Sequence, residues 1–224
     1  MDGIVVFGAG GRAGRAVSAE AVRRGHPVTA VVRDPARHPG IDVPGVTVVA
    51  GDVTDPAAAA RLLPGHAGVV AAVTPATDPA ALAALDRFDD RFYVRAVDAL
   101  LHGAEAAGVP RLVLVGLFAT LRDATGRRVL DDPAAFPAGL RAFARAHDAG
   151  LDRLRAARTP VDWLVLTPTA TLQPAGPRTG RYRTGGDTVP TDEAGPLSYR
   201  DLAVAVVDEI ASPTHHRTRV AVHT

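Results

Sequence analysis

A glycine-rich turn near the start of the sequence has the residue types and spacing of a dinucleotide phosphate-binding site. An apolar run at residues 4–7 leads directly into it, and a helical pattern follows. The small residues of such a turn permit a tight bend, let the backbone approach a pyrophosphate, and allow close packing of the next helix. Here these tasks fall on Gly8, on Gly10 or Gly11, and on Ala13 or Gly14, respectively. Glycine-rich turns are common, so the flanking strand and helix are what make the match informative.

The residue after the second apolar run predicts which nucleotide binds. Residues 28–32 form a β-rich run that ends at Arg33. An acidic residue at this position selects NAD through the ribose 2′-hydroxyl, whereas an arginine accommodates a 2′-phosphate. Arg33, helped by Arg12 in the glycine turn, therefore indicates NADPH in preference to NADH. Asp34 could instead pair with Arg33, which leaves the strictness of selection open.

Three further positions complete the predicted cofactor site. Asp52 and Val53 follow the third apolar run, where an adenine edge would lie. A role for Asp52 in a turn or helix cap is an equally open alternative. Val73 ends the fourth apolar run, at residues 69–73.

Strand and helix patterns alternate along the whole chain. The expected strands are residues 4–7, 28–32, 46–50, 69–73, 111–116, 161–166 and 219–222, and the expected helices are 12–24, 56–63, 89–107, 138–157 and 199–210. Near-continuous apolar strands separated by helices predict an α/β fold, a Rossmann-type doubly wound parallel sheet with helices on both faces. The Pro- and Gly-rich residues 167–197 are expected to be loop and short strand, either covering a substrate or forming a surface loop without function.

Composition excludes several classes of function. With 224 residues, a single NAD(P)-binding domain over 1–224 is expected. The net charge is +1 and the basic residues are scattered, which argues against nucleic-acid binding. Cysteine is absent, no run approaches the roughly 20 apolar residues of a membrane helix, and no signal peptide opens the chain, so a cytoplasmic protein without a metal site is expected.

Six blocks of sequence, spread over the whole chain, carry a resemblance to a known family. They are residues 8–14, 31–35, 51–55, 109–116, 162–168 and 176–182, of which the last two are the most specific. They resemble the atypical short-chain dehydrogenase/reductases, in the NAD(P)H-binding group that includes NmrA-like proteins and flavin/biliverdin reductases.

The resemblance also shows what this chain lacks. Most short-chain dehydrogenases use a Tyr-x-x-x-Lys pair, but all 25 basic residues here are arginine. The helix where the pair belongs carries His147, which could supply a proton or could be an ordinary surface residue. Thr120 is the only hydroxyl in the turn at residues 116–120, where the family's serine or threonine polarises the substrate.

The resemblance implies an NADPH-dependent reductase of a flat quinone, flavin or polycyclic-ketone acceptor. Hydride transfer to such acceptors can take its proton from water, so the protein mainly positions the reactants. Two alternatives stay open: a non-catalytic, NmrA-like NADP sensor, and a secondary-metabolite ketoreductase or isomerase. The expected partner is a small-molecule substrate, with neither nucleic acid nor membrane, and a homodimer is left open.

Overall fold

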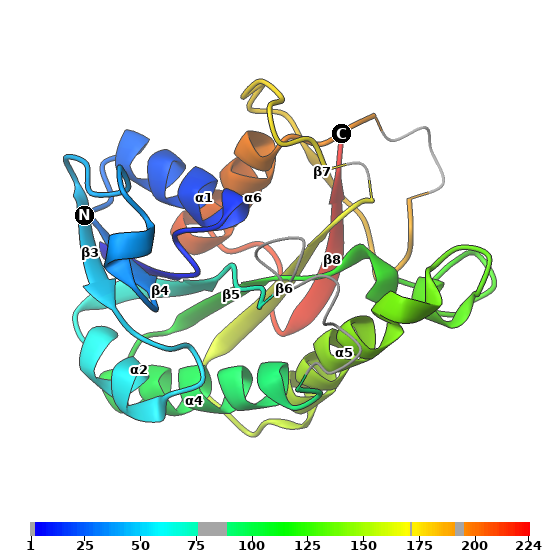
Figure 1. The fold of residues 1–224 in the computed structure, drawn as a ribbon, viewed down its shortest axis with the longest axis horizontal. Coiled ribbons are helices and arrows are strands. Elements are labelled where there is room, and N and C mark those ends of the chain that lie inside the picture. The colour runs from blue at the N-terminus through cyan, green and yellow to red at the C-terminus, as the bar shows by residue number, and fades with distance from the viewer. Residues whose placement is uncertain (1–2, 76–88, 171, 191–194) are drawn as a thin grey trace.

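The computed structural model describes residues 3–75, 89–170, 172–190 and 195–224, which form an eight-stranded sheet between two layers of helices (Figure 1). The strand order is β3-β2-β1-β4-β5-β6-β8-β7, and only β7 runs antiparallel to its neighbour. This arrangement confirms the predicted Rossmann-type, doubly wound α/β fold. The strands are β1 (Gly3–Phe7), β2 (Val28–Val32), β3 (Val46–Ala50), β4 (His66–Ala71), β5 (Arg111–Val115), β6 (Asp162–Pro168), β7 (Arg183–Thr184) and β8 (Thr218–His223).

Helices cover both faces of the sheet. In Figure 1, α1 and α6 lie on one face, and α2, α4 and α5 lie on the other. The α-helices are α1 (Arg12–Arg23), α2 (Pro56–Leu62), α4 (Phe92–Ala107), α5 (Arg141–Ala156) and α6 (Tyr199–Ala211). Short 3-10 turns occur at η1 (Pro35–Arg37), η3 (Phe118–Thr120), η4 (Val129–Asp131) and η5 (Ala138–Leu140).

Both faces of the central strands are buried, which explains why their sequences are continuously apolar. In β1, Ile4 and Val6 belong to the core beneath α1 and α6. Val5 and Phe7 belong to the core beneath α2, α4 and α5. Alternate side chains of one strand therefore enter two different cores, as a doubly covered parallel sheet requires.

Three elements begin three residues away from the expected position, and other boundaries differ by one or two residues. The strand expected at 69–73 is β4, His66–Ala71, because its partner β1 ends at Phe7, where the glycine turn begins. Val73 therefore lies beyond the end of the strand. The helix expected at 138–157 starts at Arg141, after the 3-10 turn η5, and the helix expected from residue 89 starts at Phe92.

A buried carboxylate on α1 holds Arg178, which belongs to the loop-rich segment after β6. Arg178 donates to both oxygens of Glu20, over 2.8 and 3.0 Å, and the Glu20 side chain is only 3% exposed. Arg23 and Arg24 donate to the same carboxylate. Burial alone would raise the pKa of Glu20, but the hydrogen bonds from the three arginines outweigh it and hold the pKa well below its usual range.

A second carboxylate fixes the residues next to Arg178. Asp201 of α6 accepts hydrogen bonds from the backbone and hydroxyl of Thr179 and from the backbone of Gly180, each over 2.8 Å. Farther along, the backbone of Asp187 accepts from that of Arg122. The loop-rich segment is thus attached first to α1 and α6 and then to the chain that follows β5.

The substitution Glu20→Gln is expected to destabilise the protein by about 2 kcal/mol. This lies between the roughly 1 kcal/mol of an exposed ion pair and the 3–5 kcal/mol of a fully buried one, because solvent reaches the arginines. Urea unfolding at neutral pH measures the loss, and the exposed Glu105→Gln on α4 is the matched control.

The same comparison has a defined pH dependence. Because the folded pKa of Glu20 is depressed, its contribution is complete above the ordinary glutamate pKa of about 4.3 and is lost as the pH falls below it. The difference between wild type and Glu20→Gln should therefore shrink in acid. A difference that stays constant down to about pH 3 would contradict this origin.

Candidate functional site

Two glycines allow the turn between β1 and α1 to pack closely. Gly8 has φ +77°, and a Cβ there would lie 2.4 Å from the carbonyl oxygen of Ala72. A Cβ on Gly14 would lie 2.2 Å from the carbonyl oxygen of Gly8. Of the two candidates, Gly14 and not Ala13 is therefore the residue whose missing side chain lets the helix pack closely on the turn. Gly11 is the N-cap of α1, so the positive end of the helix begins there.

A cleft of about 100 Å³ opens beside this turn, at the carboxyl ends of β1 to β4. Ligands of doubly wound sheets bind at this edge, where the strand order reverses between β1 and β4. Its lining includes the predicted residues Gly8, Gly10, Gly11, Arg33, Asp52, Val53 and Val73. Arg12, Ala13 and Gly14 lie in the first turn of α1, next to the cleft lining.

The cleft also contains residues that the sequence did not single out: His38, Thr74, Pro75 and Phe92. They come from the turn after β2, the residues after β4, and the start of α4. No sequence motif identifies them, because the paths of the connecting segments, and not a local pattern, bring them to the cleft.

Arg33 is available to a ligand, since the structure gives its neighbour Asp34 another role. The Asp34 Oδ1 atom accepts a hydrogen bond from the backbone of Ala36 over 3.1 Å and so caps η1. Among the described residues, Arg33 makes no ion pair, and its side chain is exposed. A guanidinium in this position can bind a phosphate.

Asp52 has a structural partner as well as a place in the cleft. Its Oδ1 atom accepts from the backbone and hydroxyl of Thr54, over 2.8 and 2.7 Å, which closes the turn before α2. Asp55, not Asp52, caps that helix through the backbone of Ala57. One Asp52 oxygen is therefore committed to the turn.

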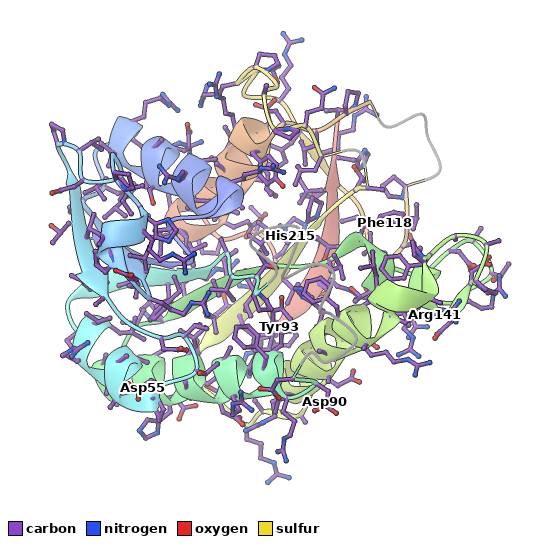
Figure 2. The ribbon with its side chains drawn as sticks, viewed as in Figure 1. Asp55, Asp90, Tyr93, Phe118, Arg141 and His215 are labelled. Carbon is purple, nitrogen blue, oxygen red and sulfur yellow. The ribbon has the colours of Figure 1, made fainter. Side chains whose placement is uncertain are left out.

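A second, apolar cavity lies between the sheet and helices α4 and α5. Its volume is about 30 Å³, and Val73 lines both it and the cleft. Tyr93 of α4 and His147 of α5 stack at its side, with ring centroids 3.7 Å apart (Figure 2 labels Tyr93). The Tyr93 hydroxyl donates to the carbonyl oxygen of Val73 over 3.4 Å.

Burial keeps both rings of this stack uncharged. It lowers the pKa of His147 to about 3, because the imidazolium form would lose its hydration among apolar side chains. Burial likewise raises the pKa of Tyr93 well above its usual value. Near neutral pH, His147 is therefore a neutral imidazole and Tyr93 an intact phenol.

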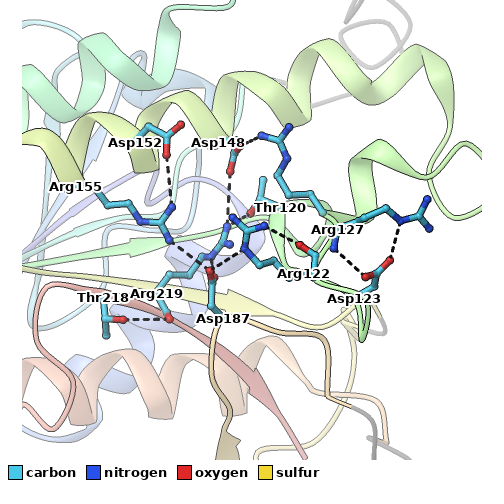
Figure 3. A network of polar contacts seen from close by, with 12 residues as sticks. Thr120, Arg122, Asp123, Arg127, Asp148, Asp152, Arg155, Asp187, Thr218 and Arg219 are labelled. Carbon is cyan, nitrogen blue, oxygen red and sulfur yellow. Dashed lines mark hydrogen bonds and ion pairs between the residues drawn. The ribbon is translucent and has the colours of Figure 1, made fainter.

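Thr120 reaches the same cavity, but its hydroxyl is already engaged. It donates to the carbonyl oxygen of Leu117 over 2.8 Å and accepts from Arg219 Nη1 over 2.8 Å. Arg219 also contacts Asp187 and lies 3.9 Å from Asp148 (Figure 3). The Thr120 proton is thus not free to polarise a substrate in this arrangement.

The adjacent histidines before β8 have structural partners. His215 pairs with Glu209 and His216 with Asp162, each over 2.7 Å, at the opposite edge of the sheet from the cleft. Within the described ranges, no three His, Cys, Asp or Glu residues are grouped as metal ligands. No helix among these residues has the length and apolar character needed to cross a membrane.

Comparison with known proteins gives matches along nearly the whole chain. The family model for NAD(P)H-binding proteins matches residues 8–213. The uncharacterised protein YwnB of Bacillus subtilis (strain 168) is 32% identical over 223 residues, which cover 98% of this chain and 97% of YwnB.

Two solved structures are similar throughout. A protein from Burkholderia pseudomallei, described as a candidate exported protein, has a TM-score of 0.82 and 35% identity, with 100% of both chains covered. A candidate NADH-flavin reductase from Streptococcus pneumoniae TIGR4 has a TM-score of 0.80 and 27% identity, covering 100% of this chain and 99% of that one.

Gly14→Ala is expected to displace α1 from the glycine turn, because its Cβ would meet backbone atoms that cannot rotate away. The expected cost is about 1–3 kcal/mol of stability, together with weakened binding of a nicotinamide dinucleotide. Thermal unfolding and nucleotide fluorescence measure the two effects. Gly139→Ala, whose Cβ would meet nothing within 4 Å, is the control. Wild-type behaviour of Gly14→Ala in both assays would contradict the role of this contact.

Proposed function

The chain belongs to the NAD(P)H-binding family, and we propose that it is an NADPH-dependent reductase of a flat quinone, flavin or polycyclic-ketone acceptor. The observation that carries this proposal is the junction of two cavities at Val73. The cleft on one side contains the glycine turn and Arg33, whereas the cavity on the other side contains the Tyr93–His147 stack. The cleft proposed to bind phosphate thus adjoins a cavity with an aromatic pair. A nicotinamide reductase needs such an arrangement, because its cofactor and its acceptor must lie side by side.

The residues of the cleft fit a dinucleotide. The close turn at Gly8 and the start of α1 suit a pyrophosphate, and the unpaired Arg33 suits a 2′-phosphate. When bound, NADPH supplies a hydride. The proposed cofactor-binding residues are Gly8, Gly10, Gly11, Arg12, Ala13, Gly14, Arg33, Asp52, Val53 and Val73.

The chain's own contribution is to orient an acceptor and to keep charge out of the cavity. Positioning alone can supply roughly 7–11 kcal/mol of a reaction barrier. Neutral His147 can donate its N–H to an acceptor oxygen, although its low pKa makes it a poor source of the proton itself. The proton is expected from water, in keeping with a sequence that has no lysine. Thr120 shapes the turn beside the cavity through Leu117.

A second candidate function, a non-catalytic NADP sensor, is favoured by the small size of the cavity. At about 30 Å³ it holds about one water molecule, whereas ligand pockets usually measure about 300–1,000 Å³. A reductase of a flat acceptor must open this cavity when the acceptor binds. A sensor uses only the larger cleft, of about 100 Å³, and leaves this cavity closed.

NADPH oxidation with a panel of quinones, flavins and biliverdin tests the proposal. Turnover of at least one acceptor is expected, and His147→Phe should lower kcat because it keeps the stacking and removes the N–H donor. The expected loss is about tenfold, the value of one hydrogen bond. The exposed His102→Phe on α4 is the control. NADPH binding without turnover of any acceptor would favour the sensor.

The pH profile separates a neutral from a titrating His147. Because burial lowers the pKa of His147 to about 3, its neutral form prevails at every pH above that value. At saturating NADPH, kcat should show no inflection from this residue between about pH 5 and 8. An inflection in that range that disappears in His147→Phe would overturn the assignment.

Arg33→Ala is expected to weaken NADPH binding by about tenfold and to leave NADH binding nearly unchanged, because only NADPH carries a 2′-phosphate. Fluorescence titration with each nucleotide gives the two Kd values. Arg158→Ala removes an exposed arginine outside the cleft lining and serves as the control. Equal weakening for both nucleotides would contradict a phosphate-specific role of Arg33.

A further inference from the structure

The imidazole of His38 lies against the backbone of the glycine turn. A Cβ built on Gly10 would be 2.5 Å from both Cε1 and Nδ1 of His38, so the ring occupies the space where a side chain on Gly10 would stand. His38 is half-buried and lines the same cleft as Arg33. One histidine thus shares the cleft wall with the glycine turn and with the arginine proposed to bind the 2′-phosphate.

The turn η1 places His38 there. Asp34 caps this turn, Pro35 is its first residue, and the backbone of His38 donates to the carbonyl oxygen of Pro35 over 3.0 Å. The chain is thereby bent back from the end of β2 across the glycine turn. Because the carboxylate of Asp34 is held by the turn, neither His38 nor Arg33 is paired with it.

The ring nitrogens of His38 are free to bind a ligand. Within the described part of the chain they have no hydrogen-bond partner. A neutral imidazole offers one N–H donor, whereas the protonated ring offers two donors and a positive charge. The charged residues on the surrounding elements are mainly cationic: Arg12 and Arg15 of α1, Arg33, Asp34 and Arg37 around η1, and Asp52 after β3. An anion in the cleft would therefore favour protonation of His38, and protonation would favour the anion.

We propose that protonated His38 binds the 2′-phosphate of NADPH together with Arg33, so that the preference for NADPH over NADH rises as the pH falls. This inference rests on the proposed function, because it assumes that the cleft takes NADPH. The contribution of His38 is present while its ring is cationic and is lost when the ring is neutral. The phosphate itself gains a proton near pH 6, which works in the opposite direction, so the effect must be isolated with variants.

The test compares Kd values for NADPH and NADH at about pH 6 and at about pH 8, because the cationic form of a histidine side chain is more populated at the lower value. The ratio Kd(NADH)/Kd(NADPH) measures the preference for NADPH. From pH 6 to pH 8, this ratio is expected to fall about tenfold more in the wild type than in His38→Gln. His38→Arg, whose charge is permanent, should keep a high ratio at both values. The exposed His102→Gln on α4 should behave as wild type.

Calorimetry gives a second readout that a purely structural role of His38 would not produce. NADPH binding near neutral pH, measured in two buffers of different ionisation enthalpy, should show proton uptake by the wild type. The uptake should be smaller in His38→Gln, and NADH should cause none. A cationic His38 also lowers the pKa of the phosphate beside it, so the difference between wild type and His38→Gln reports the coupled pair of His38 and phosphate.

Each outcome decides the inference. The inference is overturned if the Kd ratio and the proton uptake of His38→Gln equal those of the wild type. In that case, NADPH binding by the wild type still supports the proposed function. A wild type that binds neither nucleotide overturns both proposals. If His38→Gln fails to fold, the pH dependence of His38→Arg decides: a ratio as pH-dependent as that of the wild type contradicts the role of His38.

Discussion

The position of α1 depends on backbone contacts that only glycine permits. Gly8 passes beside Ala72 of the strand end, and Gly14 passes beside Gly8, at distances where a methyl group has no room. The helix is thereby brought against the carboxyl end of β1, so that its N-cap residue, Gly11, lines the cleft. Its far side presents Glu20, which receives Arg178 from the loop-rich segment. The cleft and the anchoring of residues distant in sequence thus depend on the same close packing.

The sequence was sufficient for the fold because its signals are local. Alternating apolar strands and helices define a doubly covered parallel sheet without knowledge of any long-range contact. The places of the glycine turn and of Arg33 at strand ends were predictable for the same reason. Whether these residues bind NADPH stays a prediction.

Roles that depend on distant partners could not be predicted. Residues 176–182 stood out as a family block, yet nothing local shows that Arg178 meets Glu20 or that Thr179 meets Asp201. Thr120 was singled out for its hydroxyl, but Arg219, from the other end of the chain, occupies that group. His38 carried no signal, because its approach to Gly10 depends on the bend at η1. The spacing of residues in a sequence predicts which side chains are neighbours within one helix or strand. The contacts described here form between different elements, so spacing does not predict them.

The order of strands has a consequence for how the chain folds during synthesis. β8 lies between β6 and β7, so β6 has no neighbour on that side until residues 218–223 have been made. An uncovered strand edge of apolar sequence can pair with other chains. A nascent chain in which β6 has already paired with β5 therefore carries an open, aggregation-prone edge until β8 pairs with β6.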